Sequence, residues 1–217
     1  MANIKDLLDS QPLPKTILQD IGKLAEKNNK EVYVVGGVVR DLFLGRKLKE
    51  IDLMVIGDGI EFAKQIANSM GVKKIVPFSK FSTAHIPTKP IPIEVAAARE
   101  ETYNENSRKP NEIIYTDLHG DLIRRDFTIN AMAMSITPND FGDLHDPYNG
   151  VKDLMEKHIV TPLDPDQTFS EDPLRMMRAA YFASGLDLEI DDKCLKSMKR
   201  QSKRISIVSK ELSLIHI

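Results

Sequence analysis

The sequence contains a single cysteine and no long apolar run. Because Cys194 has no cysteine partner in the chain, an internal disulfide and a cysteine-based zinc site are excluded, and a reducing compartment is indicated. No apolar run approaches the roughly 20 residues that cross a bilayer, and the N-terminal residues have no signal-peptide or transit-peptide pattern. We therefore expect a cytoplasmic protein with no membrane partner.

The chain also lacks a strong net charge. It has 30 Lys and Arg against 32 Asp and Glu, which gives a formal charge of −2. Without overall basicity, any contact with nucleic acid has to come from local basic patches. The length of 217 residues, 41% of them hydrophobic, is enough for one domain or one and a half with a buried core. Oligomeric state is not indicated by the sequence.

One stretch combines a strand, paired glycines and a helix. Apolar residues 32–35 predict the strand, Gly36 and Gly37 follow directly, and residues 38–44 have a helical pattern. Paired glycines allow close approach to a phosphate, and a helix N-terminus offers N–H groups and a positive dipole end. Arg40 lies one turn into the helix, where its guanidinium can reach the same anion. This pattern is compatible with phosphate binding, although any tight connection between a strand and a helix also uses glycine.

Two carboxylates follow on a second predicted strand. Glu50 and Asp52 alternate with Ile51 and Leu53, and strand side chains have a period of two, so both acids project from one face. Two carboxylates opposite a phosphate site can hold Mg²⁺, which prefers oxygen ligands. Alternating acids are also common on solvated strands, but their combination with the glycines favours a nucleotide–Mg²⁺ site.

The strings GGVVRD and EIDLMV resemble the head domain of class II CCA-adding enzymes and bacterial poly(A) polymerases, which are DNA polymerase β-like nucleotidyltransferases. In that family the second motif is DxD, whereas Glu50 stands here at the first acid and extends the carboxylate by about 1.5 Å. The resemblance implies an α/β (α+β) fold, with a mixed-sheet head followed by an all-helical neck. We expect the head over residues 1–165 and the neck, which would bind RNA and the base, over residues 166–217.

A third acid lies on a later strand. Short strand patterns cover residues 74–76, 83–86 and 91–96, and Glu94 lies between apolar neighbours in the last of them. Burying an acid is costly unless it is paired or binds a ligand. Glu94 is therefore either a third catalytic carboxylate, which ligates metal or accepts a proton, or an edge-strand residue facing water. The string IPIEVAAARE resembles the third acidic strand of the family, which favours the catalytic role.

Residues 100–120 are polar with little periodicity. We expect a loop here, either a functional lid or a plain surface excursion.

Two arginines precede Asp126 at the start of a predicted helix. The helix dipole does not favour cations at that end, which suggests that a bound anion supplies negative charge. Residues 124–131, RRDFTINA, resemble the corresponding motif of the family residue for residue. The resemblance implies that Arg125 binds the triphosphate of the nucleotide and that Asp126 contacts the ribose hydroxyls.

A further motif is typical of base recognition. Residues 170–172, SED, predict the start of a helix, and Arg175 and Arg178 follow Asp172 on one stripe of that helix. An aspartate and an arginine held side by side offer an acceptor and donors to the edge of a base. The string resembles the EDxxR motif of the family, which implies that Asp172 and Arg175 read the base with Arg178 beside them. The family usually has another arginine where Tyr181 stands.

The C-terminal part of the chain combines a basic helix with a departure from the family pattern. From residue 193 to 204, six basic residues are spaced three and four apart, which indicates either a phosphate-backbone track or a solvated face. From Glu211 onward the sequence no longer follows the family, and we expect either a chain that is truncated before the body and tail regions or a foreign terminus.

We therefore predict a tRNA nucleotidyltransferase. The 3′-hydroxyl of tRNA would attack the α-phosphate of CTP or ATP, without a template, to add CCA or part of it. A bacterial poly(A) polymerase remains an alternative, and the departures at Glu50 and Tyr181 also allow a non-catalytic RNA- or nucleotide-binding fragment. The predicted catalytic residues are Glu50, Asp52 and Glu94, of which Glu50 and Asp52 hold Mg²⁺. The predicted nucleotide-binding residues are Gly36, Gly37, Arg40, Arg125, Asp126, Asp172, Arg175 and Arg178.

Overall fold

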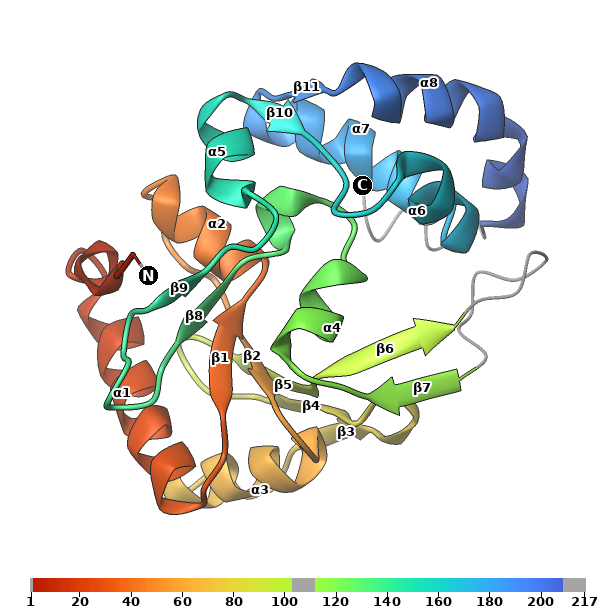
Figure 1. Ribbon diagram of the computed structural model, residues 1–217. Coiled ribbons are helices and arrows are strands. Elements are labelled where there is room, and N and C mark those ends of the chain that lie inside the picture. The colour runs from red at the N-terminus through yellow and green to blue at the C-terminus, as the bar shows by residue number, and fades with distance from the viewer. Residues whose placement is uncertain (1, 103–111, 209–217) are drawn as a thin grey trace.

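A seven-stranded mixed sheet forms the centre of the computed structural model, which describes residues 2–102 and 112–208 (Figure 1). The strand order is β3-β4-β5-β2-β1-β8-β9, in which β2 and β5 are parallel and all other neighbours are antiparallel. The strands are β1 (Val32–Val35), β2 (Ile51–Val55), β3 (Val76–Phe78), β4 (Thr83–Ile86), β5 (Ile93–Ala97), β8 (Ala133–Ser135) and β9 (Leu144–His145). The predicted mixed sheet is confirmed.

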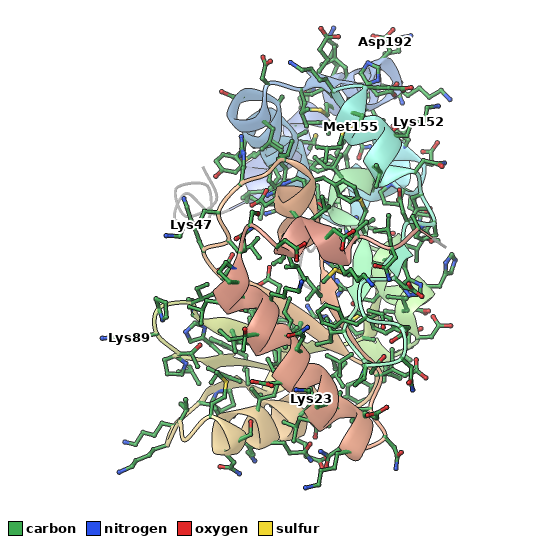
Figure 2. The ribbon with its side chains drawn as sticks, turned by 90° about the vertical axis from the view of Figure 1, so that its left-hand side faces the viewer. Lys23, Lys47, Lys89, Lys152, Met155 and Asp192 are labelled. Atoms are coloured by element: carbon green, nitrogen blue, oxygen red, sulfur yellow. The ribbon has the colours of Figure 1, made fainter. Side chains whose placement is uncertain are left out.

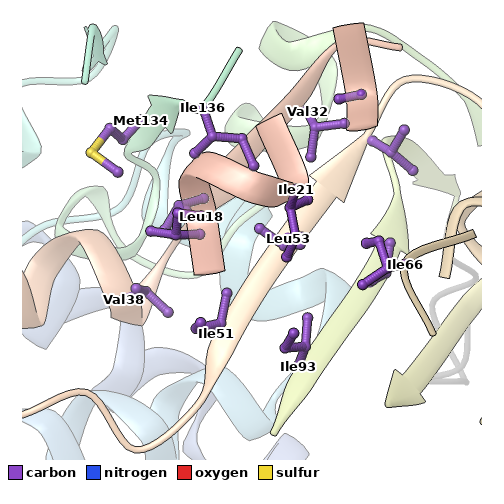
Figure 3. Close-up of a cluster of buried hydrophobic side chains, with 14 of the residues drawn as sticks. Leu18, Ile21, Val32, Val38, Ile51, Leu53, Ile66, Ile93, Met134 and Ile136 are labelled. Atoms are coloured by element: carbon purple, nitrogen blue, oxygen red, sulfur yellow. The ribbon is translucent and has the colours of Figure 1, made fainter. Parts of the chain in front are cut away.

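Two helices cover one face of this sheet. The helices α1 (Pro12–Lys27) and α3 (Gly59–Ser69) pack against alternate residues of the central strands, such as Ile51 and Leu53 of β2. Figure 3 shows these side chains in one cluster with Leu18 of α1. Fully burying such a side chain stabilises the fold by about 2 kcal/mol. The outer side of α1 carries charged residues such as Lys23 (Figure 2).

The opposite face of the sheet carries the side chains that alternate with these along each strand, and we call it the cavity face. A smaller apolar cluster lies on it and includes Met54 of β2 and Leu122 of α4 (Leu118–Ile123). Nearby, β6 (Arg99–Thr102) and β7 (Glu112–Tyr115) form an antiparallel hairpin.

The predicted loop over residues 100–120 is therefore wrong at both of its described ends, where strands and a helix occur. The hairpin is held together by backbone hydrogen bonds, which do not require apolar side chains. A polar composition therefore does not distinguish this hairpin from a loop. The central residues 103–111 lie outside the described residues, and so does the departure from the family pattern at Glu211.

The C-terminal region consists mainly of helices at one end of the sheet (Figure 1). They are α6 (Pro165–Glu171), α7 (Leu174–Leu186), α8 (Asp192–Gln201) and the 3₁₀ helix η4 (Ser202–Ile207). The two-residue strand β11 (Glu189–Ile190) pairs in parallel with β10 (His158–Ile159). A second apolar core joins this region to the head, since Phe127 packs in the same cluster as Phe169 and Met176. The proposed boundary between residues 165 and 166 stays a prediction.

Five shorter helices complete the described chain. These are the 3₁₀ helices η1 (Lys5–Leu8), η2 (Ser79–Phe81) and η3 (Thr128–Asn130) and the helices α2 (Gly37–Phe43) and α5 (Gly150–Met155). No helix in the described part of the chain is both long and apolar enough to span a bilayer.

Two predicted helix starts are wrong. Asp126 precedes only the three-residue η3, after which the chain enters β8. Ser170 lies near the end of α6, because Asp164 caps that helix earlier and accepts a hydrogen bond from the N–H of Asp166 at 2.8 Å. Asp172 instead precedes α7 and accepts a hydrogen bond from the N–H of Leu174 at 3.0 Å.

Candidate active site

A cavity of about 580 Å³ lies between the cavity face of the sheet and α7. This volume is within the usual range of small-molecule sites. Its wall contains all the residues predicted for catalysis and nucleotide binding, namely Gly36, Gly37, Arg40, Glu50, Asp52, Glu94, Arg125, Asp126, Asp172, Arg175 and Arg178. The structure thus brings together residues that are up to 142 positions apart (178 − 36) in the sequence.

The carboxylates lie on neighbouring strands. Asp52 of β2 and Glu94 of β5 are direct partners in the parallel register, so both side chains project from the cavity face. Glu50 is exposed and precedes β2. Burial raises the pKa of Asp52 to about 7, and the negative charges of Glu50 and Glu94 contribute to this shift. Partial burial and the negative charge of Glu50 also raise the pKa of Glu94, although this residue is still exposed at the cavity face. The arrangement therefore favours a cation among these acids.

The glycine turn lies next to two arginines. Gly36 has φ +65°, a backbone conformation that favours glycine, and a methyl group there would lie 2.7 Å from Nη1 of Arg125, so that this guanidinium would have to shift. It precedes α2 (Gly37–Phe43), which carries Arg40. Nη1 of Arg40 donates to Oδ1 of Asn130 at 2.7 Å, and the guanidinium lies 5.1 Å from the ring centroid of Phe182. Arg40 is thereby held in a fixed orientation on the cavity wall.

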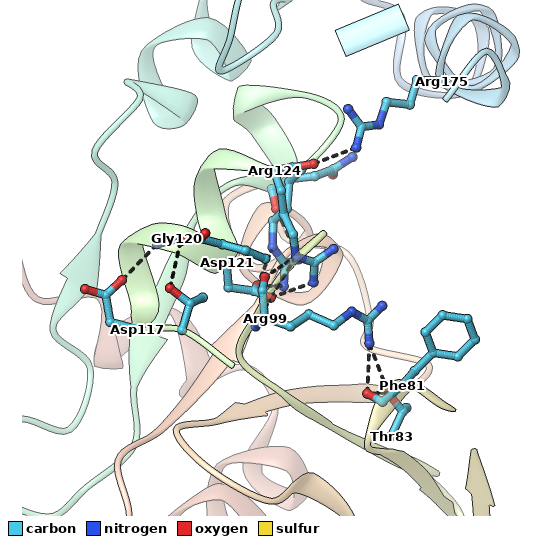
Figure 4. A network of polar contacts seen from close by, with 12 residues as sticks. Phe81, Thr83, Arg99, Asp117, Gly120, Asp121, Arg124 and Arg175 are labelled. Atoms are coloured by element: carbon cyan, nitrogen blue, oxygen red, sulfur yellow. Dashed lines mark hydrogen bonds and ion pairs between the residues drawn. The ribbon is translucent and has the colours of Figure 1, made fainter. Parts of the chain in front are cut away.

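A buried aspartate that the sequence analysis missed holds the arginine pair. Asp121 of α4 is only 1% exposed and accepts hydrogen bonds from Nη2 of Arg124 at 2.5 Å and Nη2 of Arg125 at 2.8 Å (Figure 4). Burial opposes ionisation of Asp121, but the two guanidinium groups outweigh it and hold its pKa at about 2. Spacings of i,i+3 and i,i+4 from Asp121 to the two arginines are the sequence signal, which was missed because α4 begins at Leu118, within the residues that were interpreted as a loop.

Arg124 also links two parts of the cavity. Its Nε donates to the carbonyl oxygen of Arg99 at 2.6 Å, and its own carbonyl accepts from Nη2 of Arg175 at 2.8 Å. Figure 4 shows this chain of contacts running from Arg99 to α7. The orientation of Arg175 therefore depends on the backbone of the arginine pair.

The predicted base-reading residues occupy the α7 side of the cavity. Arg175 is 7% exposed and pairs with Glu171, whose Oε2 lies 3.0 Å from Nη1 of the arginine. Arg178 donates from Nε to Oδ2 of Asp126 at 2.7 Å. Burial disfavours the charged form of Asp126, but Arg178 and Asn130 outweigh it and lower its pKa. The carboxylate of Asp126 is thus ionised and anchored to α7.

The cavity wall contains further residues that the sequence did not single out. They include Thr83 of β4, Arg99 of β6 and Phe182 of α7. Thr83 and Arg99 interact directly, with Nη1 of the arginine 3.4 Å from Oγ1. Arg99 lies near the end of the string IPIEVAAARE but was given no role there, and only the folded sheet brings the three residues to this site.

Comparison with known proteins gives a consistent result. Residues 32–160 match the family model described as the poly A polymerase head domain. The A-adding tRNA nucleotidyltransferase of Aquifex aeolicus is 42% identical over 168 residues, which are 77% of this chain and 20% of that protein. The CCA-adding enzyme of Bacillus pumilus is 34% identical over 188 residues, 86% of this chain and 45% of that protein.

Solved structures share the fold. A CCA-adding enzyme in an apo form superposes with a TM-score of 0.84 and 35% identity, covering 94% of this chain and 48% of that chain. A tRNA nucleotidyltransferase complexed with a primer tRNA and an incoming ATP analogue gives a TM-score of 0.72 and 36% identity, covering 85% of this chain and 50% of that chain. The present chain spans at most about half the length of each of these proteins.

Proposed function

Because the chain belongs to the family of poly(A) polymerase head domains, we propose that it transfers nucleotides from CTP or ATP to the 3′ end of tRNA without a template. The observation that carries this proposal is the single cavity in which Asp52 and Glu94 face the arginines of α2, α7 and the 124–125 pair. Relatives that span the matching region are named for tRNA nucleotidyl transfer. The reaction joins the 3′-oxygen to the α-phosphorus and releases pyrophosphate.

We propose Mg²⁺ as the cofactor, held by Glu50 and Asp52. Within residues 2–102 and 112–208, no group of three or more His, Cys, Asp or Glu side chains is placed to hold a metal ion by itself. Mg²⁺ commonly takes only one or two carboxylates together with substrate phosphates, so the two acids fit it. Their repulsion, which contributes to the raised pKa of Asp52, is what a divalent cation relieves. When bound, Mg²⁺ lowers the pKa of the attacking hydroxyl and stabilises charge on the phosphates.

We assign the triphosphate to the glycine turn and its arginines. Guanidinium nitrogens of Arg125 and Arg40 lie 2.7 Å and 3.4 Å from where a side chain would begin at Gly36 and Gly37, so both arginines supply positive charge directly beside the turn. Guanidinium groups in fixed positions stabilise charge on the leaving pyrophosphate without reorganisation.

The remaining acids act on the hydroxyl groups and on the base. Glu94, whose pKa is raised by burial, accepts the proton of the attacking 3′-hydroxyl, and Asp126 contacts the ribose. Asp172 and Arg175 select the base by hydrogen bonds. The contacts of Arg175 to Glu171 and to the backbone of Arg124 fix the orientation of its guanidinium group. Arg178 supports Asp126.

Incorporation of labelled CTP and labelled ATP, each measured alone on tRNA lacking its CCA end, tests this proposal. ATP incorporation on tRNA that already ends in CC, with no CTP incorporation, would indicate an A-adding enzyme like the Aquifex aeolicus relative. Incorporation of both would indicate a CCA-adding enzyme. A long A tail would support the poly(A) polymerase alternative. Absence of Mg²⁺-dependent incorporation in the wild type, with retained nucleotide binding, would support the non-catalytic alternative.

We place this activity in the cytoplasm, in keeping with a chain whose only cysteine is a buried free thiol. The assay includes Asp52→Ala as the catalytic control. It is expected to abolish incorporation while the circular dichroism spectrum stays that of the wild type.

A further inference from the structure

The edge of the sheet next to the catalytic carboxylates has an unusual composition. Residues 72–92, which contain β3 and β4, include four lysines and no aspartate or glutamate, in a chain whose net charge is −2. All four lysines, Lys73, Lys74, Lys80 and Lys89, are exposed. Figure 2 shows Lys89 extending into solvent. This is a local basic patch of the kind that attracts a phosphate backbone.

Exposed apolar side chains accompany the lysines. Val76 and Phe78 of β3 are each 49% exposed. In the register of the sheet they pair with His85 and Thr83 of β4, so all four side chains lie on the cavity face. We call these four residues the β3–β4 shelf.

The shelf is continuous with the catalytic carboxylates. His85 pairs with Glu94, and Glu94 pairs with Asp52, so one row of side chains runs across four strands from Val76 to Asp52. With strands about 4.8 Å apart, Val76 lies two strands and about 10 Å from the Glu94 position. Thr83 belongs both to the shelf and to the wall of the catalytic cavity.

The chemistry of the reaction determines which substrate approaches from this side. The attacking and leaving oxygens of a phosphoryl-type transfer lie roughly in line on opposite sides of phosphorus. The groups assigned to the triphosphate, Gly36, Arg40 and Arg125, lie on the β1–α2 side of the carboxylates. The nucleophile therefore has to arrive from the opposite side, which is that of β5, β4 and β3.

We propose that the β3–β4 shelf and its lysines bind the single-stranded 3′ end of the RNA acceptor. Single-stranded RNA is typically bound by aromatic side chains that stack on bases and by cations that contact phosphates. Phe78 supplies an exposed ring, and Arg99, whose guanidinium lies 5.1 Å from the ring centroid of Phe81, supplies a cation at the edge of the cavity. This inference rests on the proposed nucleotidyl transfer and adds the site of the second substrate.

The test measures binding of a 5′-fluorescein-labelled RNA oligonucleotide ending in CC by anisotropy, without Mg²⁺ or nucleotide. Phe78→Ala is expected to weaken binding about fivefold to 150-fold, as loss of one stacked base does, and Phe78→Trp should retain it. Lys73→Ala combined with Lys74→Ala should reduce the slope of log K against log salt by about 1.4. The matched controls are Met155→Ala and Lys23→Ala, which change exposed residues elsewhere (Figure 2).

A second readout separates this inference from the proposed activity. In the incorporation assay Phe78→Ala should raise KM for RNA and leave KM for ATP and CTP unchanged. Wild-type affinity for RNA in Phe78→Ala and in the lysine variant would overturn the proposal, as would failure of the wild type to bind the oligonucleotide. If RNA affinity falls as expected but neither the wild type nor the variants incorporate nucleotide, the result supports RNA binding at the β3–β4 shelf and contradicts the proposed activity.

A protein partner at the sheet edge is a competing occupant. Concentration-dependent dimerisation that Phe78→Ala abolishes, with RNA affinity unchanged, would assign the surface to a second copy of the chain and overturn the RNA proposal.

Discussion

Replacement of Asp52 by asparagine is expected to stabilise the metal-free protein while it removes the proposed magnesium ligand. The pKa of Asp52 is raised from 3.8 to about 7 by burial and by the charges of Glu50 and Glu94. A shift of about 3 units corresponds to about 4 kcal/mol. Asparagine has nearly the same shape and no charge, so it avoids this cost.

The size of the effect depends on pH. Because the folded protein holds a proton on Asp52 more tightly than the unfolded chain does, the free energy of unfolding falls as pH rises from about 4 to 7. At about pH 8 the wild type bears the full cost, and at about pH 4 it bears almost none. The advantage of Asp52→Asn should therefore be large at the higher pH and small at the lower one.

Thermal unfolding in EDTA, followed by circular dichroism, measures this difference. Water penetration and coupling among the three acids make the real cost of ionising Asp52 smaller than about 4 kcal/mol. Half of that cost, about 2 kcal/mol, corresponds to a rise in Tm of about 4–8 °C for a chain of this length. Added Mg²⁺ should raise the Tm of the wild type more than that of the variant. Asp20→Asn, at an exposed site where the carboxylate pairs with exposed Lys23, is the control and should change Tm little at either pH.

A gain in Tm that is equal at both pH values would refute this reasoning, because it would show that the carboxylate charge is not the source. A loss of stability at the higher pH would show that the ionised side chain makes a favourable contact that the structure does not contain.

Three further variants test other parts of the site. Asp121→Asn should lower the free energy of unfolding by about 3 kcal/mol in urea titrations; because the pKa of Asp121 is lowered to about 2, the difference from wild type should shrink as pH falls from about 4 to 2. A difference that persists at low pH would contradict the ion-pair explanation. Gly36→Ala should weaken ATP binding measured by calorimetry and cost about 1–3 kcal/mol of stability, since the backbone at φ +65° is strained for alanine and its methyl group meets Arg125. Unchanged affinity would show that this turn does not face the nucleotide. Glu50→Asp should retain or increase the incorporation rate, whereas a hundredfold loss would show that the site has adapted to the longer side chain.

The local pattern of the sequence predicted much of the sheet and of the helices behind it. The strands predicted at residues 32–35 and 83–86 agree with β1 and β4, and the helical spacing of apolar residues within 13–30 and 60–70 agrees with α1 and α3 within a few residues. The helices α1 and α3 each bury one face, which imposes a helical period on the sequence, whereas all four residues of β1 are buried and appear as a continuous apolar run.

The contacts between distant segments were not visible in the same way. Asp121 holds the arginine pair from within α4, yet its helix is only six residues long and gave no periodic signal. The prediction that a helix starts at Ser170 was wrong because Asp164 and Ser170 are both good capping residues, and the sequence does not show which of them begins the helix. Competition between two local signals six residues apart is decided by the packing of Phe169 into the core.

The alternation along β2 and β5 connects the stability of this fold with its proposed chemistry. Ile51, Leu53 and Val55 bury their side chains against the helices, and this burial fixes the register of β2. A shift of one residue would expose the apolar set and bury the acids. The same register places Asp52 opposite Glu94, although the two acids repel each other. The apolar face thus supplies the free energy that keeps two like charges together, and the cavity face is ready for a cation without rearrangement of the backbone.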